Sequence, residues 1–311
     1  MTNDFQKSKH VRPVNPDPGN MPKRKRNRYI SLFTVLTLLA LALQTLYIPS
    51  SEASAASVVL VGAGDIASCS YTTDTATAKL LDSISGTVFT TGDNVYTNGT
   101  YTQYMDCYHS NWGRHKSRTK PVPGNHEYNT SGAAGYFKYF STVRSYYAYN
   151  LGDWRIYALN SNIDVSATGA QVKWLKNDLA ANPKKCVLAY WHHPRWSSGA
   201  KYGNNSKYQA LWKTLYDAGA ELVISGHEHH YERFKQMNAS GSAVSKGMRQ
   251  FVVGTGGAGL YGFGSIRSAS EVRNSTTHGV LKLALNSTSY SWKFVPVAGK
   301  SFTDSGTTSC R

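Results

Sequence analysis

The apolar positions of this 311-residue chain fall into short runs that alternate with amphipathic stretches. Four runs predict buried strands, because they are short, rich in β-branched residues and bounded by turn residues: 58–61, 87–91, 186–190 and 222–225. Four further stretches have helical character: 75–81, 101–112, 170–179 and 208–218. In 170–179, for example, Val172, Leu175 and Leu179 recur on one face. Strands that alternate with helices indicate an α/β layered fold, with functional side chains at the carboxyl ends of the strands.

The pattern changes toward the end of the chain. Residues 250–253, 280–285 and 289–295 predict strands with no helix between them. Residues 146–149 and 154–159 predict a hairpin around Gly152-Asp153, and the prolines of Pro121-Val122-Pro123 favour an edge or a short strand. We therefore expect an α/β (α+β layered) fold in which two mixed β-sheets pack as a sandwich flanked by helices.

The first residues have the pattern of a secretory signal. A basic cluster at 23–28 precedes the apolar run 30–48, which is followed by Ala53-Ser54-Ala55. This pattern predicts cleavage after Ala55, a secreted protein, and one domain over residues 56–311. The alternative is a membrane anchor through residues 30–48, because that run is nearly long enough to span a bilayer. Its Thr, Gln and Ser content and the small residues that follow favour cleavage.

Basic residues outnumber acidic residues along the whole chain. Residues 56–311 alone contain 26 Lys and Arg against 15 Asp and Glu. We expect this excess to attract anionic substrates, and anionic surfaces such as phosphorylated cell-wall polymers. Residues 56–311 contain no Lys- and Arg-rich run, so the sequence does not predict a dedicated nucleic-acid-binding module.

The four cysteines all lie after residue 55, and none forms a CxxC pair. In an oxidising compartment this arrangement predicts two disulfides, for which three connectivities exist. We favour Cys69 with Cys107 and Cys186 with Cys310, because the second pair would connect the C-terminus to a core strand.

Five short motifs follow strand-like runs and carry the candidate chemistry. Hard oxygen donors mixed with imidazoles are what a pair of adjacent catalytic metal ions requires. Any single Gly-Asp or Gly-Asn pair could be a turn former, but five turns bearing seven compatible donors indicate a metal-dependent hydrolase. The motifs are Gly64-Asp65, Gly92-Asp93-Asn94-Val95-Tyr96, Gly124-Asn125-His126-Glu127, Trp191-His192-His193-Pro194 and Gly226-His227-Glu228-His229.

In this order the motifs resemble those of the calcineurin-like metallophosphoesterase superfamily, and within it the purple acid phosphatase-like branch. The superfamily commonly begins with Asp-x-His, whereas Asp65 is followed by Ile66-Ala67. Purple acid phosphatases also lack that His and use a Tyr three residues after the bridging Asp, which corresponds to Tyr96. They typically have Gly where Ala67 stands, so the chain departs from their pattern there.

The resemblance implies a metallophosphoesterase-type fold with two metal ions and a bridging hydroxide as the nucleophile. A phenolate ligand suits a trivalent iron, so Fe(III) with Zn, Mn or Fe(II) is favoured, and two Mn or two Zn ions are the alternative. Asp93 would bridge both ions. The implied ligands of the first ion are Asp65, Asp93, Tyr96 and His229, and those of the second are Asp93, Asn125, His192 and His227.

Further residues are implied beside the ligands. His126 resembles the family's substrate-facing His, which contacts the phosphoryl group and protonates the leaving oxygen, and we expect it to act with Asp93 in catalysis. Related enzymes place more His after the fourth motif, whereas this chain offers Lys201 and Tyr202 in that loop. His193 is expected to lie beside the ligands, and His230 to line the cleft or pack. Glu127 is expected to orient ligands or to form a structural ion pair.

The run 254–259 formally matches GxGxxG, but the residues after it are a poor helix sequence. A dinucleotide site requires that helix, so we expect a loop near the active-site rim instead.

The sequence thus predicts a secreted phosphoric ester hydrolase that acts on small phosphate monoesters in the manner of an acid phosphatase. A phosphodiesterase or nucleotidase with the same site is one alternative. A non-catalytic cell-wall or surface-binding protein on the same fold is another.

Overall fold

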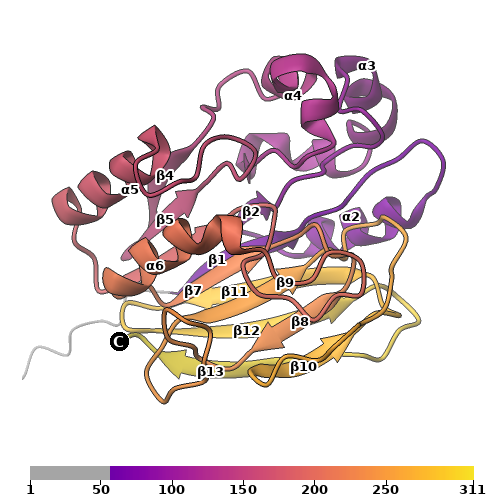
Figure 1. Ribbon diagram of the computed structural model, residues 1–311. Helices are drawn as coiled ribbons and strands as arrows, with labels where there is room; N and C mark the ends of the chain where they lie inside the picture. Colours follow the sequence, from indigo (N-terminus) through magenta and orange to yellow (C-terminus); the bar gives the residue numbers. More distant parts are fainter. Residues whose placement is uncertain (1–56) are drawn as a thin grey trace, which may run out of the picture. The chain divides into compact units, whose positions relative to one another are not determined.

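A computed structural model describes residues 57–311, in which two mixed β-sheets pack against each other with helices around them (Figure 1). The predicted two-sheet fold is confirmed for this part of the chain. The predicted signal peptide, with its apolar run 30–48, lies outside the described residues.

One sheet contains six strands, which in spatial order are β13 (Ser305–Ser309), β12 (Ser289–Pro296), β11 (Gly279–Leu285), β1 (Val58–Ala63), β2 (Thr87–Thr90) and β3 (Thr119–Pro121). The strands β1, β2 and β3 run parallel. On its other side β1 pairs antiparallel with β11, and β12 and β13 continue the antiparallel half. The beginning and the end of the described chain therefore share one sheet.

The second sheet contains seven strands, which in spatial order are β10 (Ser270–Asn274), β8 (Tyr231–Phe234), β9 (Arg249–Val253), β7 (Leu222–Ser225), β6 (Cys186–Tyr190), β5 (Trp154–Ala158) and β4 (Tyr147–Leu151). The strands β5, β6, β7 and β9 run parallel. The remaining three pair antiparallel on either side of them. The predicted hairpin around Gly152-Asp153 is confirmed as β4 and β5.

The helical segments differ in type and length. Three of them, α2, α5 and α6, correspond to the predicted helices 75–81, 170–179 and 208–218, with ends that differ by a few residues. In chain order the segments are α2 (Thr73–Ser83), α3 (Tyr101–Gln103), η1 (Tyr104–Tyr108), η2 (Trp112–Arg118), η3 (Glu127–Asn129), η4 (Ser131–Ala133), α4 (Ala134–Tyr139), α5 (Ala170–Ala181), η5 (Ser206–Tyr208) and α6 (Gln209–Asp217).

Alternation along the strands builds two apolar layers. In β6, Leu188 and Tyr190 belong to the large cluster that also contains Leu60 and Leu283 of the six-stranded sheet. Val187 and Ala189 of the same strand belong to a second cluster with apolar residues of α5 and α6. Successive side chains of a strand point to opposite faces, so β6 is buried on both faces and appears in the sequence as an unbroken apolar run. The helices α5 and α6 lie next to each other and cover this sheet (Figure 1).

The helical character predicted for 101–112 is confirmed over residues 101–108, where a short α-helix continues as a π-helix. Thr100 begins it with a capping box to Gln103, and after α3 the chain widens into the π-helix η1, where His109 N donates to Tyr104 O at 2.9 Å. Two contacts with residues distant in sequence hold this π-helical turn. Tyr104 Oη donates to Glu127 at 3.1 Å, and Cys107 is bonded to Cys69. These contacts are made by residues distant in sequence, so helical periodicity alone does not reveal them.

Four regular elements lie where the sequence pattern predicts none: α4, β8, β10 and β13. The strands β10 and β13 are polar edge strands of the two sheets. The strand β8 is buried although it contains Glu232 and Arg233, because Asp304 and Glu271 pair with Arg233 and Ser198 N donates to Glu232. A strand that contains charged residues can be buried when distant residues neutralise those charges, and a pattern of apolar residues does not detect such a strand.

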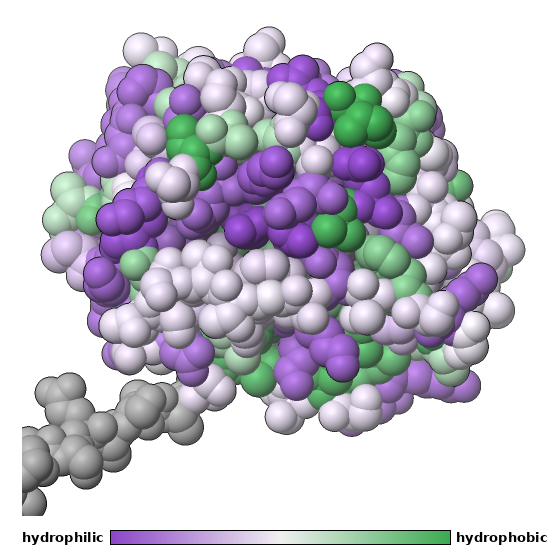
Figure 2. All heavy atoms as spheres, turned by 90° about the horizontal axis from the view of Figure 1, so that it is seen from below, coloured by the Kyte–Doolittle hydropathy of each residue, from purple (hydrophilic) through white to green (hydrophobic). Residues whose placement is uncertain are grey.

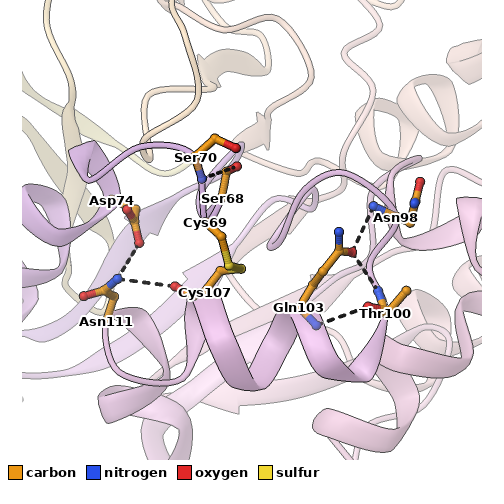
Figure 3. Close-up of a disulfide and its surroundings, with 9 residues drawn as sticks. All are labelled: Ser68, Cys69, Ser70, Asp74, Asn98, Thr100, Gln103, Cys107 and Asn111. Carbon is orange, nitrogen blue, oxygen red and sulfur yellow. Dashed lines mark hydrogen bonds between the residues drawn. A yellow bond between two sulfur atoms is a disulfide. The ribbon is translucent and has the colours of Figure 1, made fainter.

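Both favoured disulfides are confirmed. Cys69 and Cys107 join the segment after β1 to η1, close to the hydrogen-bonded pair Asp74 and Asn111 (Figure 3). Cys186 at the start of β6 is bonded to Cys310, across 124 residues of sequence. The second bond connects the end of the chain to a core strand, as expected.

The surface of the described residues is mostly polar. Only five large apolar side chains are exposed there: Tyr101, Met105, Tyr202, Val244 and Ile266. The face shown in Figure 2 carries a broad band of hydrophilic residues with scattered apolar ones between them. Within residues 57–311, every helix is too short or too polar to span a bilayer.

Candidate metal centre

The candidate ligands lie beyond the carboxyl ends of parallel strands in both sheets. Asp65, Asp93 and Asn125 follow β1, β2 and β3, whereas His192 and His227 follow β6 and β7. Parallel strands have their carboxyl ends at one edge of a sheet, so side chains that are far apart in sequence converge there. The structure brings all seven predicted ligand residues into one connected cluster, joined by the contacts described below.

The backbone at this edge has unusual conformations. Asp65, Asp93 and His227 have φ values of 60°, 48° and 68°, in the left-handed region that residues other than glycine rarely adopt. Gly92 also has a positive φ, and a Cβ there would lie 2.6 Å from Gly124 N and 2.8 Å from His192 Nδ1. Strained residues that cluster at one place are typical of a functional site.

The first group of donor atoms surrounds the hydroxyl of Tyr96. This oxygen lies 3.2 Å from Asp65 Oδ1, 3.4 Å from Asp93 Oδ2 and 3.1 Å from His229 Nε2. His229 Nδ1 lies 2.9 Å from Gly259 O, which can only accept, so Nδ1 carries a proton and Nε2 faces the group. Two carboxylates, a phenol and an imidazole nitrogen therefore meet at one point.

The second group is centred on His192, which is fully buried. Its Nδ1 donates to Thr91 O at 2.8 Å, which leaves Nε2 directed toward the other members. That Nε2 lies 3.0 Å from Asn125 Oδ1, 3.3 Å from Asp93 Oδ2 and 3.2 Å from His227 Nδ1. Asp93 thus contacts both groups through the same carboxylate oxygen.

The electrostatics of the cluster favour a positive charge beside Asp93. Burial lowers the pKa of His192, but the facing carboxylate of Asp93 outweighs it and raises the pKa to about 9. Burial raises the pKa of Asp93, yet His192 and His126 hold it well below its usual range. Burial and the neighbouring His192 lower the pKa of His227 to about 3. The proton of His192 lies beside the buried carboxylate of Asp93, where a metal cation would be stabilised in its place, whereas His227 is neutral and free to bind a cation.

The phenol of Tyr96 supports the same conclusion. Burial and the carboxylates of Asp65 and Asp93 raise its pKa well above the usual value. A phenolate at this position therefore requires a cation beside it. The donor set, which combines carboxylates, an amide, a phenol and imidazoles, fits two transition-metal ions that share Asp93.

His126 lies at the opening of the cluster. Its backbone N–H donates to Asp93 Oδ1 at 2.9 Å, and its Nδ1 donates to Thr97 O at 2.7 Å. The remaining nitrogen, Nε2, lies 3.8 Å from Asp93 Oδ2, and 27% of the side chain is exposed. This nitrogen can therefore contact a group that enters from solvent.

Glu127 is buried behind the ligands. Its carboxylate accepts from the backbone N–H groups of Asn94, Val95 and Gly124 at 2.9, 3.2 and 2.6 Å. Burial and the nearby Asp93 raise its pKa to about 7. Glu127 thus holds the loops after β2 and β3 together, as expected for a residue that orients ligands.

The two remaining histidines of the motifs lie in different surroundings. A ring nitrogen of His193 lies within 4.8 Å of ring nitrogens of both His192 and His227, and its Nδ1 is 2.8 Å from Ser161 Oγ. His230 is fully buried against Phe263, with Nε2 at 3.5 Å from Glu232. His193 is therefore a neighbour of the second group, whereas the His230 side chain packs against Phe263 and Glu232.

The rim of the cluster contains the predicted Lys201 and Tyr202, and also Tyr261, which the sequence interpretation did not single out. The ring of Tyr202 stacks on His227 with centroids 4.1 Å apart. Tyr261 lies 4.7 Å from the His229 ring, and its hydroxyl donates to His227 O at 2.7 Å. The glycine-rich run just before Tyr261 was the sequence feature that marked this segment as part of the rim.

Comparisons with known proteins agree with this geometry. Residues 58–231 match the family described as calcineurin-like phosphoesterase. Purple acid phosphatase 15 of Arabidopsis thaliana is 29% identical over 229 residues, which cover 60% of this chain and 42% of that protein. Purple acid phosphatase 23 of the same plant is 25% identical over 63% of this chain and 52% of its own length. The chain thus spans about half the length of these relatives, or less.

Solved structures share the fold. The purple acid phosphatase PPD1 from yellow lupin seeds superposes with a TM-score of 0.71 at 19% identity, over 81% of this chain and 54% of that one. GAP50, described as the anchor in the inner membrane complex of Plasmodium, superposes with a TM-score of 0.64 at 15% identity, over 80% of this chain and 88% of that one. Because proteins with such different descriptions share the fold, the fold alone does not determine an activity.

Proposed function

This chain belongs to the calcineurin-like phosphoesterase family, and on that premise we propose that it hydrolyses phosphate monoesters at a centre of two metal ions. The observation that carries the proposal is the position of Asp93, whose Oδ2 lies 3.4 Å from the Tyr96 hydroxyl and 3.3 Å from His192 Nε2. A carboxylate between two sets of donors is what a bridging ligand requires. The similarity to purple acid phosphatases supports the same activity.

The ligand assignment follows the two groups of donor atoms. Asp93 would be shared by both cations. The first cation would be held by Asp65, Asp93, Tyr96 and His229, and the second by Asp93, Asn125, His192 and His227. A phenolate ligand favours Fe(III) in the first position, with Zn, Mn or Fe(II) in the second.

The residues of the chain have separate roles in this proposal. Two bound cations supply an activated water and neutralise the charge that develops at phosphorus. His126 presents Nε2 toward the opening, because its Nδ1 donates to Thr97 O. In the doubly protonated imidazolium form, this Nε2 would donate a proton to the leaving oxygen. Glu127 keeps the loops that carry Asp93 and Asn125 at a fixed separation.

The test combines metal analysis with kinetics. We expect the purified protein to contain two metal ions per chain and to hydrolyse a chromogenic monoester faster than the matching diester. Asp93→Ala should remove the metal pair and lower turnover by at least about 100-fold, a loss typical of removing one strong transition-state contact. A faster diester reaction would favour the phosphodiesterase alternative. A protein replete with metal but inactive on both esters would favour the non-catalytic alternative.

We also propose that the protein is exported, with cleavage after Ala55 and a catalytic domain over residues 56–311. The support is the signal-like sequence together with two disulfides, which persist in oxidising compartments. N-terminal sequencing of the protein from culture medium tests this, since the expected first residue is Ala56.

A further inference from the structure

Two arginines lie over the indole ring of Trp196, and neither of them belongs to the groups of candidate metal ligands. The Cζ atom of Arg195 lies 3.6 Å from the ring centroid, and the Cζ atom of Arg267 lies 5.5 Å from it. A guanidinium group over an indole face is held there by a cation–π attraction. Both side chains are half-buried. Two positive charges from distant parts of the sequence therefore meet beside one ring.

These two charges have no counter-charge from the described part of the chain. Within residues 57–311, none of the ion pairs includes Arg195 or Arg267. Arg195 Nε donates to Gln209 Oε1 at 2.6 Å, which is a neutral acceptor. Burial and the positive charge of Arg267 lower the pKa of Arg195. The two guanidinium groups thus repel each other at a site where water is partly excluded.

The indole N–H of Trp196 is a further donor at the same place. Only 5% of Trp196 is exposed, and its Nε1 has no hydrogen-bond acceptor among the described residues. A buried indole N–H normally finds an acceptor, because leaving it unpaired costs free energy. Nε1 belongs to the ring over which both arginines lie, so donors from three side chains are gathered around one indole.

Close packing fixes the position of this ring. The centroid of Trp196 lies 6.2 Å from that of Trp212 in α6, and both rings belong to the apolar cluster that α5 and α6 share with the seven-stranded sheet. Gly241 lies against the ring, since a Cβ at that position would be 2.6 Å from Cζ2 of Trp196. The backbone of the second arginine is also held, because Arg267 N donates to Ser198 Oγ at 3.0 Å. The donors are therefore presented by a built structure.

We propose that Arg195, Arg267 and the indole N–H of Trp196 form a binding site for a phosphate-type oxyanion, separate from the metal centre. The planar fork of a guanidinium group matches the oxygens of phosphate, and a tetrahedral oxyanion has enough lone pairs to accept from both arginines and from the indole. Its negative charge also relieves the repulsion between the two arginines. Inorganic phosphate and the phosphate group of a larger molecule share this chemistry. The site goes beyond the proposed ester hydrolysis, because none of its donors is a proposed metal ligand.

The indole N–H resonance of Trp196 tests the proposal directly. Zinc-loaded protein is diamagnetic, and ¹⁵N-labelled tryptophan gives a simple spectrum in which Trp196→Phe identifies the signal. We expect inorganic phosphate, added at constant ionic strength, to move this signal downfield along a saturable curve. Arg195→Gln and Arg267→Gln should each weaken the affinity at least about tenfold, since a charge-assisted hydrogen bond contributes that much. The indole signals of the other tryptophans report whether each variant is folded.

Two further variants separate this site from other effects of phosphate. Arg144→Gln is the matched control, because Arg144 is exposed in another loop without an ion pair in the described chain and should leave the affinity unchanged. Asp93→Ala, which lacks the proposed bridging ligand, should keep the Trp196 response. Methylphosphonate distinguishes the two sources of the anion. Equal affinity for both anions supports a site that also accepts phosphate groups on larger molecules, and a preference for inorganic phosphate supports a site for the free ion.

Three outcomes would overturn the proposal. The first is a Trp196 signal that phosphate does not shift along a saturable curve, because solvent alone then satisfies the indole N–H. The second is equal weakening by Arg267→Gln and Arg144→Gln, which indicates a general charge effect. The third is loss of the response in folded Asp93→Ala, which places the anion at the metal centre. Absence of esterase activity beside an intact Trp196 response would instead contradict only the proposed function.

Discussion

At the scale of the residue, the surroundings of Tyr96 show why the cluster should bind a cation. Its hydroxyl lies within 3.4 Å of two carboxylate oxygens and one imidazole nitrogen, and burial together with the two carboxylates raises the pKa of the phenol well above its usual value. The phenol has a single hydrogen and so cannot donate to both carboxylates at once. A cation in this position relieves the conflict by converting three competing acceptors into ligands.

Tyr96→Phe tests the nature of that cation. If Fe(III) is bound by the phenolate, the wild type should absorb visible light and the variant should be colourless, because the ligand-to-metal transition is lost. A visible spectrum with metal analysis on both proteins measures this. Tyr202→Phe is the control, because this exposed Tyr stacks on a candidate ligand without contacting the first group through its hydroxyl. A colourless wild type that contains only Mn or Zn would contradict the iron assignment.

Glu127→Ala tests the residue that holds two ligand loops together. It leaves three buried backbone N–H groups and the Tyr104 hydroxyl without an acceptor, so we expect the free energy of unfolding to fall by about 3 kcal/mol or more. Chemical denaturation measures the loss, and the metal content should fall with it. Tyr104→Phe removes only one of the four donors and should cost about 1 kcal/mol. Equal stability of Glu127→Ala and the wild type would contradict the role.

The sequence was enough to predict the ligand residues, but it predicted only part of the rim. Five of the seven candidate ligands directly follow an apolar run or a glycine, and Tyr96 and His229 lie two or three residues further along the same motifs, so the local pattern marks them. Tyr261 reaches the site because residues 259–264 hydrogen-bond to residues 198–200, and nothing in the local sequence encodes that pairing. Lys201 and Tyr202 were found only as the replacements for expected histidines in the family resemblance.

At the scale of the element, burial on both faces explains which strands the sequence predicts well. The strand β6 is apolar throughout, and β7 is apolar except for its last residue, Ser225, because helices cover one face and the other sheet covers the opposite face. The strand β8 is equally buried but contains a Glu and an Arg whose partners are elsewhere in the chain. The difference lies in tertiary pairing, which apolar periodicity does not record.

The helix α2 contains a buried carboxyl group with a clear pH dependence. Burial raises the pKa of Asp74 to about 6, although Asn111 Nδ2 donates to its Oδ2 at 2.8 Å. The folded protein therefore holds this proton more tightly than the unfolded chain, and the resulting stability is present below about pH 4 and is lost as the pH rises to about 6. The loss over this window is roughly 2–3 kcal/mol.

Asp74→Asn should remove that pH dependence. The variant carries no charge at this position, so the difference in free energy of unfolding between variant and wild type should grow in favour of the variant between pH 4 and pH 6, within the window set by Asp74. Urea denaturation at several pH values measures it. Asp153→Asn in the exposed β4–β5 turn is the control and should follow the wild type. Parallel pH profiles for Asp74→Asn and the wild type would contradict the assignment.

At the scale of the whole molecule, the cluster of candidate ligands and the disulfides connect distant parts of the chain. Asp65, Asp93 and Asn125 extend from one sheet, and the histidines extend from the other. The cluster therefore exists only when both sheets have formed. The bond between Cys186 and Cys310 in turn fixes the end of the chain on β6, where Arg311 N also donates to Glu221 at 2.7 Å.

Replacing both Cys186 and Cys310 by Ala should lower the free energy of unfolding by roughly 2–5 kcal/mol, because the long loop they close gains entropy in the unfolded chain. Urea denaturation without reductant measures the loss. Wild-type protein denatured with reductant is the comparison, and it should lose at least as much stability because both disulfides open. An unchanged midpoint and slope for the double variant would show that the bond contributes nothing to stability.

The pairing of β1 with β11 has a consequence for how the chain is made. The strand β1 gains β2 as a neighbour early in synthesis, but its other edge has no partner until residues 279–285 emerge. During that interval all strands of the seven-stranded sheet are synthesised. The unpaired edge of β1 meanwhile remains open to association with other chains. A nascent chain that stops before residue 279 should therefore accumulate in inclusion bodies, and chaperones that cover open strand edges should improve the yield of the complete chain.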